Sequence, residues 1–398
     1  MSFLSSVQLV IDPVIDFAGS GLTDASWLQM VIFTLVVTHV TIAAVTIYLH
    51  RSQAHRALDL HPIVSHFFRF WLWMTTGMTT LEWVAIHRKH HAKCETPEDP
   101  HSPQTRGIKK VFFEGAELYR EESKNAETMT KYGHGTPNDW IERNVYQRHS
   151  VLGVSLMMII DLMLFGVAGM AIWAVQMAWI PITAAGIING IGHYWGYRNF
   201  GSQDASRNVL PWGIIIGGEE LHNNHHTYGT SARLSNKWYE FDIGWMYIKL
   251  MSYVGLATVR KQAPKPKFVM PRPHVDLDAL QAVIAHRYDV MAKYAKSVRA
   301  TYSKEKHAAP ALRGVKRSLN RDATALAEVD RAKLQSALAE SHGLKLLYEM
   351  RLELNKLWER SNLSTEQLLA HLQAWCHKAE ASGSQPLREM SLRLRSYA

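Results

Sequence analysis

The sequence predicts an all-α protein that is anchored in a membrane by several helical spans and that ends in a separate helical extension. Three observations support this fold class. The segment from Trp27 to Leu49 holds 23 residues without a charge. A longer apolar tract runs from Val151 to Trp195. After a proline-rich stretch, the last third of the chain becomes charged and places its apolar residues at helical spacing.

The first apolar segment is long enough to cross a bilayer. At about 1.5 Å per residue a helix of this length spans roughly 35 Å. No basic residue precedes it, and it is too long for the core of a signal peptide. Residues 1–26 hold no convincing span, because their apolar run "VQLVIDPVID" is interrupted by Asp12 and Pro13. We therefore expect an interfacial segment there.

The second apolar tract predicts a helical hairpin. Its spans are expected near 151–167 and 172–194, with a turn near 166–170. Asp161 is the only acid inside the tract, and an ionisable residue in a span usually faces the protein interior. A third apolar stretch, 62–86, contains Arg69 and Glu82, so we interpret it as a helix or hairpin at the membrane surface.

The distribution of Lys and Arg predicts the orientation. Residues 1–26 and the hairpin turn contain none, whereas the segments after Leu49, before Val151 and after Tyr197 contain many. The N-terminus and the hairpin turn are therefore expected outside, and the rest of the polar chain in the cytoplasm.

The overall composition is basic. The 398 residues carry a net charge of +9, with a pI of about 9.4 and a mean hydropathy of −0.14. A basic chain favours anionic partners, and here we expect membrane lipids or a phosphorylated ligand rather than nucleic acid. Cys94 and Cys376 lie far apart in the sequence, which argues against a disulfide framework and against a cysteine-based zinc site.

Histidines gather in three short segments, "HRSQAH" at 50–55, "HRKHH" at 87–91 and "HNNHH" at 222–226. Positions i, i+3 and i+4 share one helix face, so each of the last two segments presents its imidazoles together. Neutral imidazole is the commonest metal ligand, and eight exceed what one ion takes. We therefore predict two metal ions, although imidazole alone does not name the metal. Because positions five apart diverge on an α-helix, we expect the helix to end or bend between His50 and His55.

In this order and spacing, the three segments resemble the histidine boxes of the membrane fatty acid desaturases. The similarity is greatest to the Δ9 acyl-CoA (stearoyl-CoA type) branch, in a bacterial-like form. Further stretches carry the resemblance: "EWVAIHRKHH", "EDPHS", "NGIGHYWGYR" and "DASRN". It covers residues 27–261.

The resemblance implies two iron ions (Fe2+/Fe3+) as cofactors. It assigns nine histidines as ligands and adds Asn189 as a contact through water. By position in this sequence, the histidines are His50, His55, His87, His90, His91, His193, His222, His225 and His226. The chemistry is then carried by the di-iron centre, and no side chain is assigned as catalytic.

The same resemblance implies O₂-dependent desaturation of a fatty acyl thioester, such as acyl-CoA, or of an acyl lipid, at the Δ9 position. The tail has no H-P-G-G haem motif and no flavin fingerprint, so we expect an external electron donor, a ferredoxin or a flavoprotein reductase. The active site would face the cytoplasm from a bacterial inner membrane. Trp83 is a candidate substrate contact, and Thr46 and Ile42, one and two turns before His50, are candidates for the end of an acyl tunnel.

Two alternatives stay open at this point. A related membrane hydroxylase would share the histidine segments and differ in its product. A metal transporter would place its ligands near the middle of several spans, whereas here they are predicted at span ends.

The sequence divides into four regions: an interfacial segment (1–26), a membrane desaturase domain (27–261), a linker (262–274) and a cytoplasmic helical extension of unknown role (275–398). In the extension, helical spacing covers 275–302, 321–340 and 344–359, and Ser364 with Gln367 predicts a capping box. No family is recognised there. Six further histidines lack the box spacing and are expected in surface, cap or helix-contact roles: His39, His61, His66, His101, His134 and His149.

Overall fold

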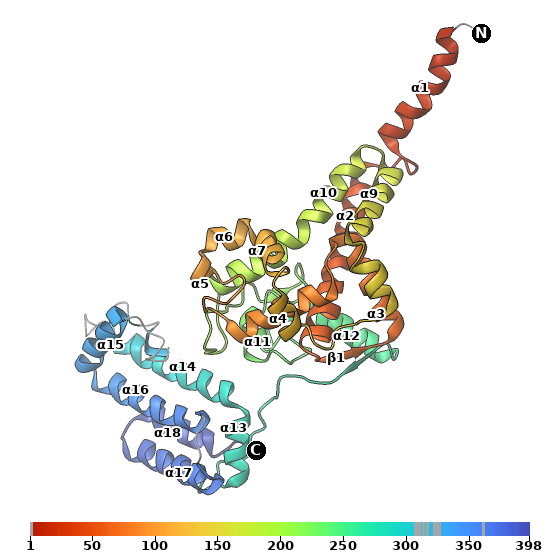
Figure 1. Cartoon of the computed structure of the whole chain (residues 1–398). Coiled ribbons are helices and arrows are strands. Elements are labelled where there is room, and N and C mark those ends of the chain that lie inside the picture. Colours follow the sequence, from red (N-terminus) through yellow and green to blue (C-terminus); the bar gives the residue numbers. More distant parts are fainter. Residues whose placement is uncertain (1–2, 306–311, 313–314, 316–317, 321–327, 360–362) are drawn as a thin grey trace. The chain divides into compact units, whose positions relative to one another are not determined.

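The computed structural model describes the whole chain except residues 1–2, 306–311, 313–314, 316–317, 321–327 and 360–362. It divides into two compact units (Figure 1). Unit 1 comprises residues 1–198 and 204–263, and unit 2 comprises residues 199–203 and 264–398. The described residues are predominantly helical, so the predicted all-α class is confirmed.

The first span of unit 1 changes its winding along its length. It begins as α2 (Trp27–Ala43), where Ser26 and Gln29 form a capping box. It continues without interruption as a π-helix, η1 (Ala44–Ala54). Together they form one of two helices among the described residues that are long and apolar enough to cross a membrane, the other being Ala168–His193.

The predicted hairpin is present in unit 1. α9 (Ser150–Phe165) and α10 (Ala168–Ile180) are antiparallel and joined at Gly166, whose φ of 59° suits glycine. The second arm continues as the π-helix η3 (Pro181–Gly190) and the 3₁₀ turn η4 (Ile191–His193). Asp161 is fully buried, as its position inside the tract predicts. α9 itself is apolar but shorter than the two candidate spans.

The N-terminal helix α1 (Phe3–Ser20) ends beside the hairpin turn. The backbone N–H of Leu22 donates to the carbonyl of Met163 at 2.9 Å, and that of Val167 donates to Ala18 at 2.9 Å. The chain's start and the hairpin turn therefore lie at the same end of unit 1, as their shared lack of Lys and Arg predicts. Figure 1 shows α4 and α11 at the opposite end of this unit.

The apolar stretch 62–86 forms two helices instead of one long span. α3 (Pro62–Thr76) ends at Gly77, whose φ of 64° closes the turn, and α4 (Thr80–Lys93) begins after Thr79, which caps it. The predicted helix or hairpin is thus confirmed, and its place at a membrane surface stays a prediction.

Short elements complete unit 1. β1 pairs antiparallel with β4, and β2 pairs with β3. Their bounds are β1 (Leu58–Leu60), β2 (Trp212–Gly213), β3 (Phe241–Asp242) and β4 (Ala257–Val259). The remaining helices are α5 (Pro103–Arg106), α6 (Ile108–Phe113), α7 (Gly115–Glu122), α8 (Ala126–Tyr132), η2 (Glu142–Tyr146), α11 (His222–Thr227) and α12 (Ile243–Tyr253).

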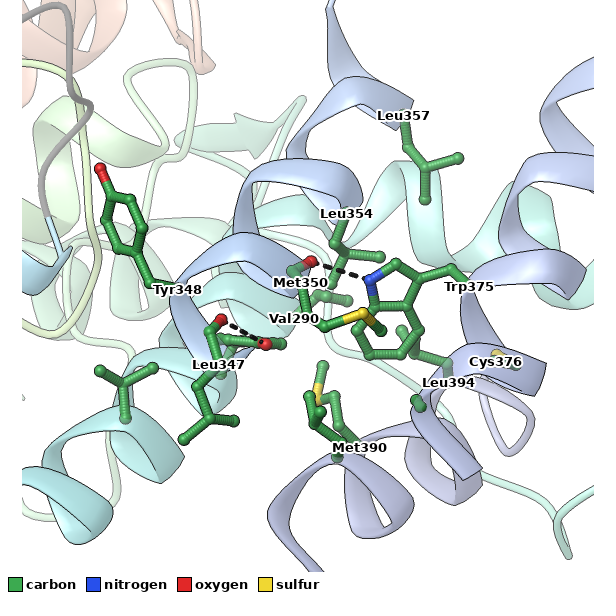
Figure 2. Packing of buried hydrophobic residues seen from close by; sticks show 14 of the residues in the cluster. Val290, Leu347, Tyr348, Met350, Leu354, Leu357, Trp375, Cys376, Met390 and Leu394 are labelled. Carbon is green, nitrogen blue, oxygen red and sulfur yellow. Dashed lines mark hydrogen bonds between the residues drawn. The ribbon is translucent and has the colours of Figure 1, made fainter. Parts of the chain in front are cut away.

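Unit 2 is a helical domain with a core of its own. Its described helices are α13 (Leu277–Ala285), α14 (Arg287–Glu305), η6 (Ser318–Asn320), α15 (Glu328–Glu340), α16 (His342–Asn355), η8 (Lys356–Trp358), α17 (Thr365–Ala381) and α18 (Gln385–Leu394). In its core the Trp375 indole donates to the Met350 carbonyl at 2.8 Å (Figure 2). The predicted capping box of Ser364 and Gln367 heads α17 and is confirmed. The predicted helix over 321–340 is described only from Glu328, because 321–327 lie outside the described residues.

A buried ion pair ties the first span to the loops that follow the hairpin. The guanidinium of Arg51 meets both carboxylate oxygens of Asp242, at 3.0 and 3.1 Å, and donates to the carbonyls of Gly217 and Ala232. Gly218 lies against this pair with φ 101°, and a Cβ there would meet the Asp242 carboxylate at 2.3 Å. A larger residue at 218 would therefore displace the pair.

Arg51→Met should destabilise unit 1 strongly, because it leaves the Asp242 carboxylate buried without its cation. We expect a loss of about 3–5 kcal/mol in unfolding free energy. The matched control is Arg260→Met, since the Arg260–Asp59 pair is half exposed and should contribute less than about 1 kcal/mol. Unfolding of the purified proteins in detergent measures both, and equal losses would contradict the role given to the buried pair.

Candidate metal centre

The π-helical end of the first span brings His50 and His55 to one side. A π turn hydrogen-bonds residues five apart, and the N–H of His55 indeed donates to the carbonyl of His50 at 3.1 Å. Residues five apart therefore lie nearly above one another, and the two imidazole ring centroids are 4.9 Å apart. The helix was expected to end or bend between them. It does end there, at Ala54 with His55 as its C-cap, but it first continues past His50 as a π-helix, and this winding brings the two rings together.

The other histidines come from three further elements. The last turns of α4 carry His87, His90 and His91, and η4 carries His193. α11 is a short helix that holds His222, His225 and His226 on one face. The nine predicted histidines thus converge from η1, α4, η4 and α11, and they form two groups.

The first group contains five imidazoles whose ligand atoms all lie within 4.8 Å of one another: His50, His55, His87, His91 and His225. The Nε2 atom of His225 lies 3.0 Å from that of His50 and 2.9 Å from that of His91. The Nε2 atoms of His55 and His87 are 2.8 Å apart. All five rings therefore direct a nitrogen to one small volume.

The second group contains the remaining four imidazoles. The Nε2 atom of His193 lies 3.2 Å from that of His90 and 2.9 Å from that of His222. The ring of His226 lies 4.4 Å from that of His222 and 4.6 Å from that of His193, measured between centroids. Cys94 borders this group, with its Sγ 4.0 Å from the His90 Nε2.

Three carboxylates hold the outer nitrogens of these rings. Nδ1 of His50 donates to Glu219 at 2.7 Å, Nδ1 of His90 to Asp99 at 2.9 Å, and Nδ1 of His226 to Asp204 at 2.9 Å. Since a carboxylate only accepts, each of these protons sits on Nδ1. Nε2 of each ring is then a lone pair aimed inward, the arrangement found at metal-binding histidines.

The electrostatics agree with neutral rings and charged carboxylates. Two effects lower the pKa values of five imidazole rings well below the ordinary range. Burial is the larger effect, and repulsion between neighbouring imidazoles adds to it. The five rings are those of His55, His87, His91, His222 and His225. Burial acts against ionisation of Asp99 and Asp204, but the adjacent imidazoles outweigh it and lower both carboxyl pKa values. Metal ligation requires these protonation states.

The donor set fits two metal ions. Metal–nitrogen bonds of about 2.1 Å at right angles place two ligand nitrogens about 3.0 Å apart. The facing Nε2 pairs are separated by 2.8–3.2 Å. Buried lone pairs at such distances repel one another unless a cation lies between them. The second nitrogens of His193, His222 and His225 and Nε2 of His226 have no hydrogen-bond partner within the described structure.

The other predicted site residues are Trp83, Ile42, Thr46 and Asn189. Trp83 stacks on His87 with ring centroids 4.8 Å apart, so it borders the first group. Ile42 and Thr46 are buried, and both lie against Gly217. Thr46 also donates to Glu219, the partner of His50. Asn189 is half-buried in η3, one turn before His193, and its predicted contact with a metal through water stays a prediction.

Sequence reasoning missed the carboxylates and one histidine. Asp99 and Asp204 lie in "EDPHS" and "DASRN", stretches noted only for their resemblance, and Glu219 begins the "EELHNNHH" run. His101 was expected at the surface or as a cap, which is wrong: it is buried and stacks on His90 at 4.4 Å. Burial lowers its pKa to about 3. By contrast, His61 does cap α3, and His39 meets the Tyr247 hydroxyl at 2.7 Å.

A family model described as fatty acid desaturase matches residues 25–243, more than half of the chain. The chain belongs to the fatty acid desaturase family. Fatty acid desaturases are oxidoreductases, the enzyme class that the sequence predicts for this chain. The family is associated with membranes, in keeping with the two apolar helices.

Curated relatives match the same part of the chain. A probable chloroplastic lipid desaturase of Arabidopsis thaliana, ADS3.2, is 31% identical over 54% of this chain and 58% of its own length. The acyl-CoA 5-desaturase AL21 of Anemone leveillei is 29% identical over 59% of this chain and 71% of its own. The sn-1 stearoyl-lipid 9-desaturase of Anabaena variabilis is 28% identical, over 56% and 79%. The chain thus spans less than two thirds of the first of these relatives.

A second family model, described as transposase, matches residues 251–398. This match covers less than half of the chain and falls mainly on unit 2. The sequence patterns of the tail had suggested a helical domain but no family.

Asp99→Asn should weaken metal binding, because it removes the charge that polarises His90 and replaces one of two oxygens that accept the backbone N–H groups of Glu95 and His101. We expect about tenfold or greater loss of affinity, measured by competition with a chelator on the metal-free protein. The neighbouring Glu98→Gln is the matched control, since Glu98 is exposed and pairs with Lys93. Equal affinities in the two variants would contradict the role of Asp99.

Proposed function

We propose that the chain desaturates a long-chain fatty acyl substrate with O₂ at a centre of two iron ions. The observation that carries the proposal is the pair of imidazole groups in a chain of this family. In a balanced reaction, a –CH₂–CH₂– unit, O₂, two electrons and two protons give –CH=CH– and two water molecules. The nine histidines would hold the two ions, with Asn189 reaching one of them through water.

The bound ions would supply the oxidising power, since an unactivated C–H bond has no acidity for a side-chain base to use. The protein's own residues position and shield the site. Glu219, Asp99 and Asp204 fix the tautomers of their imidazoles, so that the inward nitrogens stay free of protons. Burial of the ligand rings, five of which are at most 2% exposed, excludes water. The indole of Trp83 covers His87 and would border the acyl chain.

The proposed substrate is an acyl-CoA desaturated at Δ9, and an acyl lipid is the alternative carrier. CoA and the headgroup of a phospholipid both carry phosphate. A polar cavity of about 250 Å³ adjoins the first histidine segment and is lined in part by Ser52, Arg56 and Arg260. Arg260 is paired there with Asp59, whereas Arg56 would suit a phosphate, which supports a carrier that approaches from this side. We infer that this side faces the cytoplasm of a bacterial inner membrane.

Replacing any one of His90, His193 or His225 with Ala should abolish desaturation, because each removes a ligand that the others cannot replace. Cells expressing each variant are analysed for new double bonds by mass spectrometry, and the purified chains for iron. The unaltered chain should hold close to two irons. His134→Ala, at an exposed histidine outside both groups, is the control and should keep full activity. A fully active chain with a single zinc would overturn the proposal.

The tunnel prediction concerns Ile42 and Thr46. If one of them borders the end of the acyl tunnel, Ile42→Trp or Thr46→Trp shortens it and shifts the product ratio from eighteen-carbon toward sixteen-carbon chains. Because both residues pack against Gly217, each variant is first checked for folding and iron content. An unchanged ratio in both, in folded and iron-loaded protein, would reject the placement.

A further inference from the structure

The net positive charge of the chain lies in unit 2. Unit 1 carries 21 Lys and Arg residues against 21 Asp and Glu residues, so its formal charge is zero. Unit 2 carries 23 basic residues against 14 acidic ones, which accounts for the whole net charge of +9. The histidine groups therefore lie in a unit without net charge, and the basic excess of the chain belongs to unit 2.

The helix α14 gathers part of this charge on one face. Its buried side packs into the core of unit 2 through Val290, Tyr294, Val298 and Tyr302. Its solvent side presents four exposed cations within twelve residues, Lys293, Lys296, Arg299 and Lys304, which we name the α14 basic face. At 100° per residue these four side chains span about 140° of the helix circumference. They therefore form one continuous surface.

No acid of α14 neutralises this face. The helix contains two acidic residues, Asp289 and Glu305. Asp289 accepts hydrogen bonds from Arg393 and from the Tyr397 hydroxyl, at 3.1 and 2.6 Å. Glu305 accepts from Ser341 at the start of α16. Within the described residues, no carboxylate lies at ion-pair distance from the four cations, so their charge is available to a partner.

We infer that the α14 basic face docks an acidic electron-carrier protein that supplies the two electrons of each desaturation. This inference rests on the proposed function, which consumes electrons from outside the chain. It follows from charge complementarity, because unit 1 has no net charge that would attract an acidic carrier, whereas unit 2 has a net charge of +9. Since unit 2 is covalently joined to unit 1, a carrier held on α14 is kept at a high effective concentration for the metal centre.

The test compares two variants with the same net charge. The quadruple variant K293Q/K296Q/R299Q/K304Q removes the α14 basic face. The control, K265Q/K333Q/K345Q/K356Q, removes four exposed cations elsewhere in unit 2. Both full-length chains are placed in nanodiscs of zwitterionic lipid, which removes lipid charge as a variable. Electrons come either from an acidic ferredoxin with its reductase or from a neutral small-molecule mediator.

At low salt the quadruple variant should raise the KM for the ferredoxin about tenfold, while kcat stays within about twofold. Its rate should also lose most of its dependence on salt, because screened charge contacts are what salt weakens. The control should match the unaltered chain, and the mediator should drive all three chains equally. Oxidised ferredoxin is also titrated against each chain, which measures binding without turnover. The quadruple variant alone should lose affinity, by about the same factor.

Equal KM and affinity in the two variants would overturn the inference. The same chains are tested for binding of a DNA duplex and in a second set of nanodiscs made of anionic lipid. The inference would also fail if a DNA duplex bound through the α14 basic face while ferredoxin bound all chains equally. It would fail as well if the quadruple variant differed only in the anionic nanodiscs. If neither electron source yields any double bond, the proposed function fails. The ferredoxin titration still decides the docking inference in that case.

Discussion

Unit 1 has to hold several buried imidazole nitrogens that carry no proton close to one another, and the rest of its structure depends on this constraint. A neutral imidazole carries one hydrogen, and in His50 and His90 the Nδ1 atoms donate to Glu219 and Asp99, which leaves Nε2 of the neutral ring as a lone pair. The Nε2 atom of His50 nevertheless lies 3.0 Å from that of His225, and the Nε2 atom of His90 lies 3.2 Å from that of His193. In a water-excluded interior this arrangement is unfavourable by itself, and it becomes favourable when cations bind. The fold around it therefore has to resist the tendency of the rings to move apart.

That resistance comes from features that a regular helix would not provide. The π winding of η1 turns His50 and His55 to the same side and buries Arg51 next to them. Arg51 then fixes the loop that contains Gly217 and Gly218 through its pair with Asp242. The same loop carries Glu219. One change of helical winding thus positions two ligands, a structural cation and, through that cation, a carboxylate that orients His50.

Sequence reasoning recovered what depends on composition and on short-range spacing. Apolar length predicted the first span and the hairpin turn at Gly166, and the repeated H-x-x-H-H spacing pointed to the histidines that the structure brings together in two groups. It did not recover the π-helix, because no residue type marks the insertion of an extra residue per turn and tertiary packing stabilises it. It also missed Asp204 and His101, whose partners lie far away in the sequence or outside the box spacing. The whole-chain net charge did not show that the basic excess lies in unit 2.

The two imidazole groups are not equivalent, and the difference follows from the surrounding charge. The first group has five imidazoles and one hydrogen-bonded carboxylate, Glu219, whose charge is shared with Arg51 at 3.9 Å. The second has four imidazoles and two hydrogen-bonded carboxylates, Asp99 and Asp204, with Glu95 3.5 Å from the His193 Nδ1. An ion held by the second group would therefore meet fewer imidazoles and more carboxylate charge than an ion held by the first, and this charge would favour a more positive ion.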